Sequence, residues 1–215
     1  MPSIGFGTYK LQEGKECLES VKFALENGYR HIDTAAVYEN ERSVGEAIRQ
    51  SGLSREDIFI TTKVWNTERG YEKTLKAFEE SMDRLGLDYL DLYLVHWPAN
   101  AKQYRHPEKL NADTWRAMEH LYAEGKVRSI GVSNFLVSHL NDLMETAAIV
   151  PMVNQIEYHP GYTQQETVDV CRKHRIVVEA WSPLGRGRVL EEPLLVELAA
   201  GNLCIAEISY SSADH

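Results

Sequence analysis

Apolar residues recur along the chain in two alternating patterns, one with helical spacing and one of short, almost continuously apolar runs. The helical spacing predicts helices over Lys15–Asn27, Arg42–Ser51, Tyr71–Leu85, Asp113–Glu124, Ser138–Ala147 and Thr163–Arg175, and a short helix over Leu194–Ala200. Thr163 followed by Glu166 predicts a capping box at the start of the sixth helix. The apolar runs predict strands over Arg30–Thr34, Ile58–Val64, Leu90–His96, Val127–Ser133, Pro151–Glu157 and Ile176–Ala180.

Strands and helices alternate in six repeats, and this order favours a parallel sheet covered by helices. Two architectures fit it, an open doubly wound sheet and a (β/α)8 TIM barrel. An open dinucleotide-binding sheet normally carries G-x-G-x-x-G after its first strand, whereas this chain has TAAVYEN there. In a barrel, catalytic residues lie at the carboxyl ends of successive strands, and this chain has polar residues at those positions. The sequence therefore predicts an α/β fold of the (β/α)8 barrel type, with about six βα units encoded.

Composition limits the partners and the cellular compartment. The 215 residues are 43% hydrophobic, and no apolar run approaches the length of a membrane span, which predicts a soluble globular protein. A formal net charge of −9 argues against a nucleic-acid partner. Cys17, Cys171 and Cys204 are far apart and odd in number, which indicates reduced thiols. We therefore expect a cytoplasmic protein with no membrane or nucleic-acid partner and no metal.

Four polar side chains follow the ends of three consecutive predicted strands: Asp33, Tyr38, Lys63 and His96. A buried carboxylate needs a cation beside it, and Lys63 at the end of the next strand is the best candidate for Asp33. Each residue alone has a simpler explanation, namely a structural ion pair, a loop tyrosine and a core histidine. Their shared position at strand ends favours a catalytic site.

Five segments together resemble the aldo-keto reductase family, in the usual order of that family: GYRHIDTAAVYENERSVGEAI, TTKVWN, MDRLGLDYLDLYLVHWP, KVRSIGVSNF and VNQIEYHP. The likeness runs from about Ile4 to about Leu190 and is greatest to prokaryotic reductases of small aldehydes and keto-sugars. The resemblance implies a (β/α)8 barrel that reduces aldehydes and ketones to alcohols with hydride from NADPH and without a metal. Its partner would be a small-molecule carbonyl substrate.

The resemblance also implies roles for individual residues. The catalytic positions of the family fall on Asp33, Tyr38, Lys63 and His96, with Tyr38 as the general acid. Its cofactor-binding positions fall on Gly7, Thr8, Ser133, Asn134, Gln155, Trp181, Ser182, Leu184 and Gly185, with Arg186 and Arg188 beside the phosphates. The substrate-binding positions fall on Tyr9, Trp65, His96 and Trp97.

Elementary electrostatics supports the role of Tyr38. A free phenol titrates near ~10 and donates its proton poorly at neutral pH. An ammonium about 4 Å away would favour the phenolate by roughly 4 kcal/mol at an effective dielectric constant of about 20. We therefore expect Lys63 to lower the pKa of Tyr38, Asp33 to keep Lys63 charged, and His96 to aim the substrate carbonyl.

The family resemblance is lost near the end of the chain. The lysine, serine and arginine that hold the adenosine 2′-phosphate in the family have no counterparts, and residues 201–215 resemble no part of it. We therefore expect a C-terminally truncated family member, with residues 1–200 forming one incomplete barrel domain whose open edges favour self-association. Two alternatives stay open: a non-catalytic barrel that binds cofactor or a partner weakly, and an aldolase or isomerase that uses Lys63 as a Schiff-base nucleophile.

Overall fold

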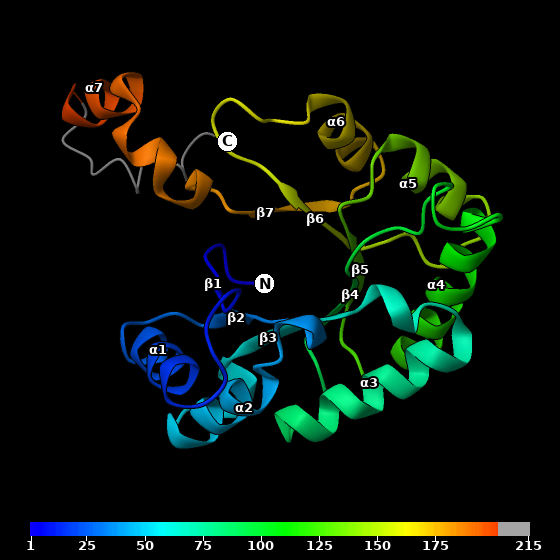
Figure 1. Ribbon diagram of the computed structural model, residues 1–215, viewed down its shortest axis with the longest axis horizontal. Helices are drawn as coiled ribbons and strands as arrows, with labels where there is room; N and C mark the ends of the chain where they lie inside the picture. Colours follow the sequence, from blue (N-terminus) through cyan, green and yellow to red (C-terminus); the bar gives the residue numbers. More distant parts are fainter. Residues whose placement is uncertain (202–215) are drawn as a thin grey trace.

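The computed structural model describes residues 1–201, which form one curled parallel sheet with helices around its outer side (Figure 1). The seven strands pair in sequence order: β1 (Phe6–Gly7), β2 (His31–Asp33), β3 (Phe59–Val64), β4 (Leu92–Val95), β5 (Ile130–Ser133), β6 (Val153–Glu157) and β7 (Val177–Trp181). The helices are α1 (Lys15–Glu26), α2 (Glu41–Gln50), α3 (Tyr71–Leu85), α4 (Pro107–Ala123), α5 (Val137–Met144), α6 (Gln165–Lys173) and α7 (Pro193–Gly201). One helix separates each pair of consecutive strands, so the chain repeats a βα unit.

The sheet has one more strand than the sequence predicted. All six predicted strands are present, and the additional strand, β1, pairs in parallel with β2 through Phe6 and Gly7. A strand of two residues, one of them glycine, has too short a side-chain pattern to be recognised. The predicted barrel architecture is therefore correct, but the number of strands was too low.

Two predicted helix starts were wrong. Helix α4 begins at Pro107 instead of Asp113, because proline at the first turn of a helix has the required φ and needs no hydrogen-bond partner there. The predicted capping box of Thr163 with Glu166 is absent, and α6 follows Gln164, whose backbone is left-handed with φ 46°. The side chain of Gln164 instead donates a 2.7 Å hydrogen bond to the carbonyl of Glu157.

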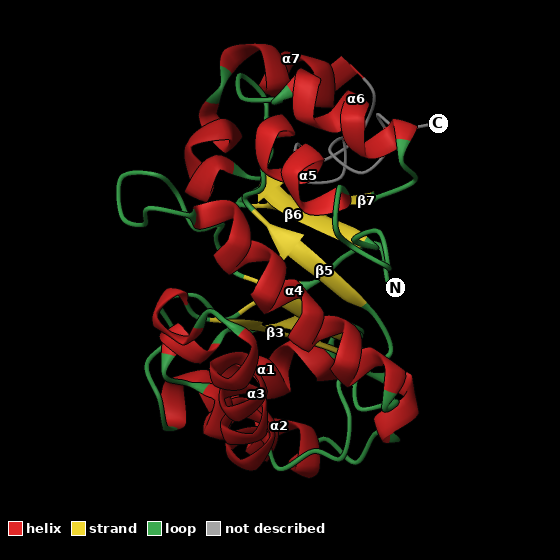
Figure 2. Ribbon diagram, turned by 90° about the vertical axis from the view of Figure 1, so that its right-hand side faces the viewer, coloured by secondary structure: helices red, strands yellow, loops and turns green. Residues whose placement is uncertain are grey.

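The hydrophobic core lies between the outer face of the sheet and the helices, as the side view in Figure 2 shows for α4 and α5 over β5 and β6. Phe78 of α3 packs edge-on against Tyr93 of β4, with ring centroids 5.3 Å apart, and both rings are buried. Helices α2 and α3 approach so closely that a Cβ at Gly45 would overlap the carbonyl oxygen of Leu85. Close packing of this kind leaves these two helices little freedom to shift against each other.

Several expectations concern particular parts of the chain. Cys17 and Cys171 are buried free thiols, in agreement with the expectation, whereas Cys204 lies outside the described residues. Most of the predicted tail, residues 202–215, also lies outside them. Among the described residues, no helix is both long and apolar enough to cross a membrane.

Candidate active site

Asp33 at the end of β2 and Lys63 in β3 form an ion pair on the inner face of the sheet. Nζ of Lys63 lies 2.5 Å from Oδ1 of Asp33 and donates a second hydrogen bond, 2.9 Å long, to the carbonyl of Thr34. Burial alone would lower the pKa of Lys63, but the charge of Asp33 and that of an ionised Tyr38 outweigh it and raise this pKa. Lys63 therefore remains an ammonium, as the sequence predicted.

Tyr38 ends a short 3₁₀ turn, Ala36–Tyr38, that directly follows β2. The ammonium of Lys63 lies 5.3 Å from the centroid of its ring. Burial raises the pKa of Tyr38 above its ordinary value, although Lys63 acts to lower it. The expected net lowering of this pKa was wrong, because desolvation outweighs the effect of Lys63, and Asp33 opposes that effect with its negative charge.

His96 directly follows β4 and packs between two aromatic rings. Its ring centroid lies 5.7 Å from that of Tyr38 and 5.1 Å from that of Trp65, both in edge-to-face arrangements. Burial and the neighbouring Lys63 lower the pKa of His96 to about 3. The imidazole is therefore neutral at physiological pH, with one nitrogen as donor and the other as acceptor. Its Nδ1 is buried and has no hydrogen-bond partner among the described residues.

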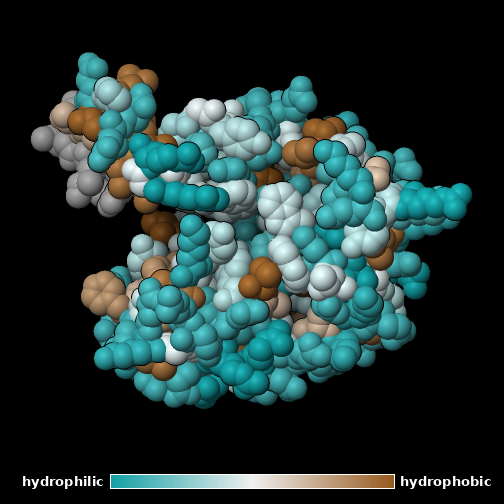
Figure 3. Space-filling view, in the orientation of Figure 1, coloured by the Kyte–Doolittle hydropathy of each residue, from teal (hydrophilic) through white to brown (hydrophobic). Residues whose placement is uncertain are grey.

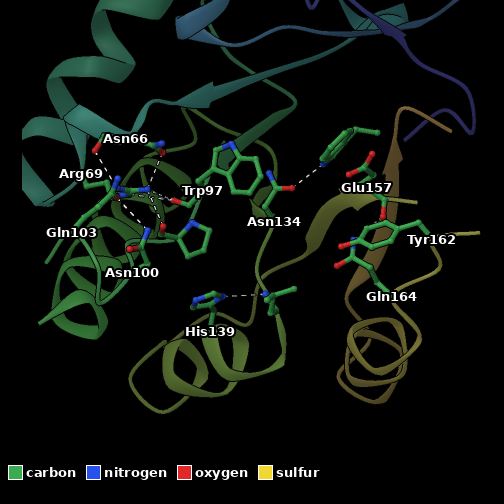
Figure 4. A pocket seen from close by; sticks show the side chains of 13 residues that line it. Asn66, Arg69, Trp97, Asn100, Gln103, Asn134, His139, Glu157, Tyr162 and Gln164 are labelled. Atoms are coloured by element: carbon green, nitrogen blue, oxygen red, sulfur yellow. Dashed lines mark hydrogen bonds between the residues drawn. The ribbon is translucent and has the colours of Figure 1, made fainter. Parts of the chain in front are cut away.

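Asn134 joins the carboxyl ends of β4, β5 and β7. Its Nδ2 donates hydrogen bonds of 3.0 Å to the carbonyl of His96 and to Oγ of Ser133. Its Oδ1 accepts a 2.9 Å hydrogen bond from the indole of Trp181, seen as a dashed line in Figure 4. The backbone of Asn134 is left-handed, with φ 63°, and such strain is typical of functional sites. These predicted cofactor residues therefore form one connected group.

Two predicted cofactor residues make other contacts in this structure. Gln155 on β6 donates a 2.8 Å hydrogen bond through Nε2 to Oδ2 of Asp33. Thr8 is fully buried, and its hydroxyl donates to Oδ1 of Asn40 at 3.3 Å. The side chain of Thr8 is thus part of an internal polar network, while Gly7 beside it lies exposed on β1.

The loop after β7 holds the remaining predicted cofactor positions, Ser182, Leu184 and Gly185. The amide of Gly185 donates a 2.8 Å hydrogen bond to the carbonyl of Ser182, and both residues have positive φ, at 54° and 51°. Arg186 and Arg188 follow and are exposed. A tight turn followed by two guanidinium groups at the end of a barrel strand suits an anionic group.

The predicted substrate residues surround the same end of the sheet. Tyr9 and Trp97 expose 58% and 42% of their surface, and Trp65 is half-buried, so all three present aromatic area to a ligand. The ring of Tyr9 lies 5.2 Å from that of Tyr38. In the space-filling view, this face of the molecule is hollowed near its centre (Figure 3).

A pocket of about 370 Å³ lies beside these residues and is bounded by Trp97, Asn134 and Trp181 together with polar loop side chains. Arg69 borders it and was not predicted as a site residue. Its guanidinium donates to the carbonyls of Trp97 and Pro98 at 2.8 and 2.9 Å (Figure 4). Arg69 therefore fixes the loop after β4, and a lone loop arginine gives no sequence signal for that role.

Asn40 and Glu179 were also missed. Asn40 is fully buried and uses its amide to bridge the carbonyls of Thr8 and Leu11, at 2.9 and 3.0 Å. Its Oδ1 also accepts a 2.9 Å hydrogen bond from Thr34. Glu179 carries a carboxyl group on the inner face of β7, and its position within the apolar run IVVEAW was a signal that could have found it. Asn40 is thus bonded to the residue that follows Asp33, and an oxygen of Glu179 lies within 4.8 Å of an oxygen of Asp33.

The fold and the site together define an α/β barrel protein with a polar site at the carboxyl ends of its strands. The chain belongs to the aldo/keto reductase family, whose model matches residues 3–194. It is 55% identical over 199 residues to glyoxal reductase of Bacillus subtilis, covering 93% of this chain and 69% of that protein. The resemblance inferred from the sequence is thus confirmed.

Solved structures agree with this assignment. A crystal structure of an aldo/keto reductase from Brucella melitensis is 45% identical with a TM-score of 0.89, covering 98% of this chain and 78% of that one. The aldo-keto reductase of Bombyx mori, solved in complex with NADP, is 35% identical with a TM-score of 0.86, covering 98% and 75%. The predicted barrel fold is confirmed by these likenesses.

Proposed function

We propose that this chain reduces small aldehydes and ketones to alcohols with NADPH, and that Tyr38 is the proton donor. The observation that carries the proposal is the convergence of Asp33, Tyr38, Lys63 and His96 at the ends of β2, β3 and β4. A buried ammonium 5.3 Å from the ring centroid of Tyr38 is an expensive arrangement that a purely structural role does not require.

Each residue of this group has a distinct part in the proposed reaction. Tyr38 donates its proton to the carbonyl oxygen as that oxygen gains negative charge. Lys63 stabilises the phenolate that forms, and Asp33 holds the Lys63 ammonium in position through their 2.5 Å contact. His96, as a neutral imidazole, can hydrogen-bond the carbonyl oxygen and orient it toward Tyr38.

The residues at the ends of β5, β6 and β7 fit a nicotinamide dinucleotide in their chemistry. Ser133, Asn134 and Gln155 provide hydroxyl and amide groups, which match a carboxamide that both donates and accepts hydrogen bonds. The ring of Trp181 offers a flat apolar face, and Arg186 and Arg188 offer positive charge for phosphates. The cofactor, when bound, supplies the hydride for the carbonyl carbon. Because Asn134 is hydrogen-bonded to Trp181, binding would exchange some of these internal hydrogen bonds.

The substrate would be a small, reactive carbonyl compound. The similar protein of Bacillus subtilis is a glyoxal reductase. Tyr9 beside Tyr38, Trp65 beside His96 and Trp97 in the adjoining pocket offer aromatic surface that suits a compact substrate. The alternative role of Lys63 as a Schiff-base nucleophile is disfavoured, because a nucleophilic amine must be neutral whereas the pKa of Lys63 is raised.

The proposal is tested by following NADPH consumption when the purified chain is mixed with glyoxal or another small aldehyde. We expect steady consumption by the wild-type chain and a loss of about 10²-fold or more in kcat for Tyr38→Phe. Tyr122→Phe, a change to an exposed tyrosine of α4 outside the pocket and the proposed catalytic group, is the matched control for loss of a hydroxyl. Equal turnover by wild type and Tyr38→Phe would contradict the acid role.

A further inference from the structure

Glu179 is an acidic side chain on the inner face of β7 that the proposed reaction does not yet use. It lies in register with Gln155 of β6, and its side chain is 16% exposed. Its Oε1 lies 3.9 Å from Nε2 of His31, while its Oε2 is buried and has no hydrogen-bond partner among the described residues. A carboxyl oxygen without a partner, inside the curl of the sheet, calls for a physical explanation.

The carboxyl group of Glu179 faces the Asp33–Lys63 pair across the inside of the curled sheet. Ligand-type atoms of His31, Asp33 and Glu179 all lie within 4.8 Å of one another. The groups facing Glu179 are therefore His31 and Asp33 of β2, Lys63 of β3 and the neutral amide of Gln155 on β6. Lys63 is already paired with Asp33, so Glu179 is a second carboxylate beside a single ammonium.

His31 does not act as a second cation in this cluster. Burial lowers its pKa, so the ring is neutral at physiological pH, and its Nε2 hydrogen-bonds Oγ1 of Thr61 at 2.9 Å. Burial and the charge of Asp33 raise the pKa of Glu179 to about 7. Two carboxyl groups at this separation do not both ionise readily, and the one without the ammonium is the one that keeps a proton.

We propose that Glu179 is a positioning residue that gains and loses a proton on the inner face of the barrel and thereby sets how strongly Lys63 acts on Tyr38. The inference rests on the proposed reductase function and adds a regulator to that same site. When Glu179 is neutral, the charge of Lys63 is opposed by Asp33 alone and favours proton donation by Tyr38. When Glu179 is anionic, a second negative charge offsets Lys63, and Tyr38 becomes a weaker acid.

The consequence is that the rate of carbonyl reduction depends on pH through the ionisation of Glu179. The value of kcat is higher on the acidic side of about pH 7, where Glu179 is protonated, and lower on the alkaline side. An interaction equivalent to one pKa unit changes a rate by up to about tenfold. His96 does not supply this transition, because its pKa is lowered to about 3.

The first test measures kcat against pH with saturating NADPH and a small aldehyde for wild type, Glu179→Gln and the control Glu166→Gln. Glu166 is exposed on α6, so Glu166→Gln removes a carboxylate outside the cluster of Asp33, Lys63 and Glu179. We expect kcat of wild type and control to fall by about threefold to tenfold between about pH 6 and pH 8, and Glu179→Gln to be flat across that range. A Glu179→Gln profile that keeps the fall, or a wild-type profile without it, would overturn the proposal.

A second test needs no turnover, so it separates this inference from the reductase function. Carboxyl ¹³C NMR, assigned with Glu179→Gln, follows the ionisation of Glu179 in wild type and in Asp33→Asn. We expect a midpoint near 7 that falls by about one unit or more in Asp33→Asn, where the like charge is gone. A midpoint in the ordinary carboxyl range in wild type overturns the proposal even in an active enzyme. An inactive chain with the expected titration instead contradicts the reductase function and supports the proton site.

Discussion

Nε2 of Gln155 donates a 2.8 Å hydrogen bond to Oδ2 of Asp33, joining β6 to β2 across 122 positions of sequence. The two strands are separated by three others in the sheet, so this contact exists only because the sheet curls until its inner side chains meet. The two oxygens of Asp33 are thus used separately, Oδ1 by Lys63 and Oδ2 by Gln155. Asp33 is held from both sides.

Gln155→Leu should therefore weaken the site while nearly conserving side-chain volume. The change leaves Oδ2 of Asp33 without its donor in a half-buried place, and we expect a loss of about 1 to 3 kcal/mol in the free energy of unfolding. We also expect kcat to fall, because the carboxylate that orients Lys63 gains freedom. Urea unfolding and steady-state kinetics measure the two effects. Gln165→Leu, at an exposed position of α6, is the matched control and should change neither.

The neutral state of His96 gives a prediction about pH. Its pKa is lowered to about 3, so the folded protein binds fewer protons at this position than the unfolded chain when the pH is between that value and the ordinary 6.5. The stabilisation is complete above pH 6.5 and is lost as the pH falls toward 3. Histidine ¹⁵N NMR, with His96→Asn to assign the signal, should show a neutral ring throughout the range from pH 5 to pH 9. A midpoint near 6.5 for this signal would refute the assignment.

The pKa of Glu179 predicts the opposite dependence of stability on pH. Its value in the folded chain is raised from 4.5 to about 7, so the folded chain binds more protons than the unfolded chain between these values. The resulting stabilisation is present below about pH 4.5 and is lost as the pH rises through about 7, with a magnitude on the order of 3 kcal/mol. The unfolding free energy of wild type relative to that of Glu179→Gln should therefore fall as the pH rises from 5 to 8. A difference that does not vary with pH would count against it.

Asn40 should be important for stability. Its side chain takes part in hydrogen bonds with Thr8, Leu11 and Thr34 and is fully buried, so Asn40→Ala leaves several buried polar groups without partners. We expect a loss of about 2 to 4 kcal/mol in the free energy of unfolding, measured by urea denaturation. Asn141→Ala, in an exposed part of α5, should cost far less and serves as control. Equal stability of the two variants would show that the network contributes little.

The fold could be predicted from the sequence where its patterns are long. Helix α3 begins and ends where the apolar spacing placed it, at Tyr71 and Leu85, because fifteen residues carry four helical turns of periodicity. β1 could not be found, since Phe6 and Gly7 make a strand only through pairing with β2. The start of α4 was misplaced because the polar residues after Pro107 lack an apolar pattern.

The sequence could predict those site residues that lie at the ends of predicted strands. Asp33, Lys63 and His96 come together because parallel strands of one barrel end on the same side. The contact of Gln155 with Asp33 could not be predicted, because it depends on how far the sheet curls. The raised pKa of Tyr38 also could not, because it depends on how much water the folded chain excludes from the phenol.

The central claim is that this chain transfers hydride from NADPH to a carbonyl carbon while Tyr38 supplies the proton. The most direct measurement uses NADPH deuterated at the transferred position and mass spectrometry of the alcohol formed from glyoxal or a related aldehyde. We predict one deuterium in the alcohol made by wild type and a yield from Tyr38→Phe lower by about 10²-fold or more over the same time. An alcohol without deuterium, no alcohol at all, or an equal yield from Tyr38→Phe would contradict the claim.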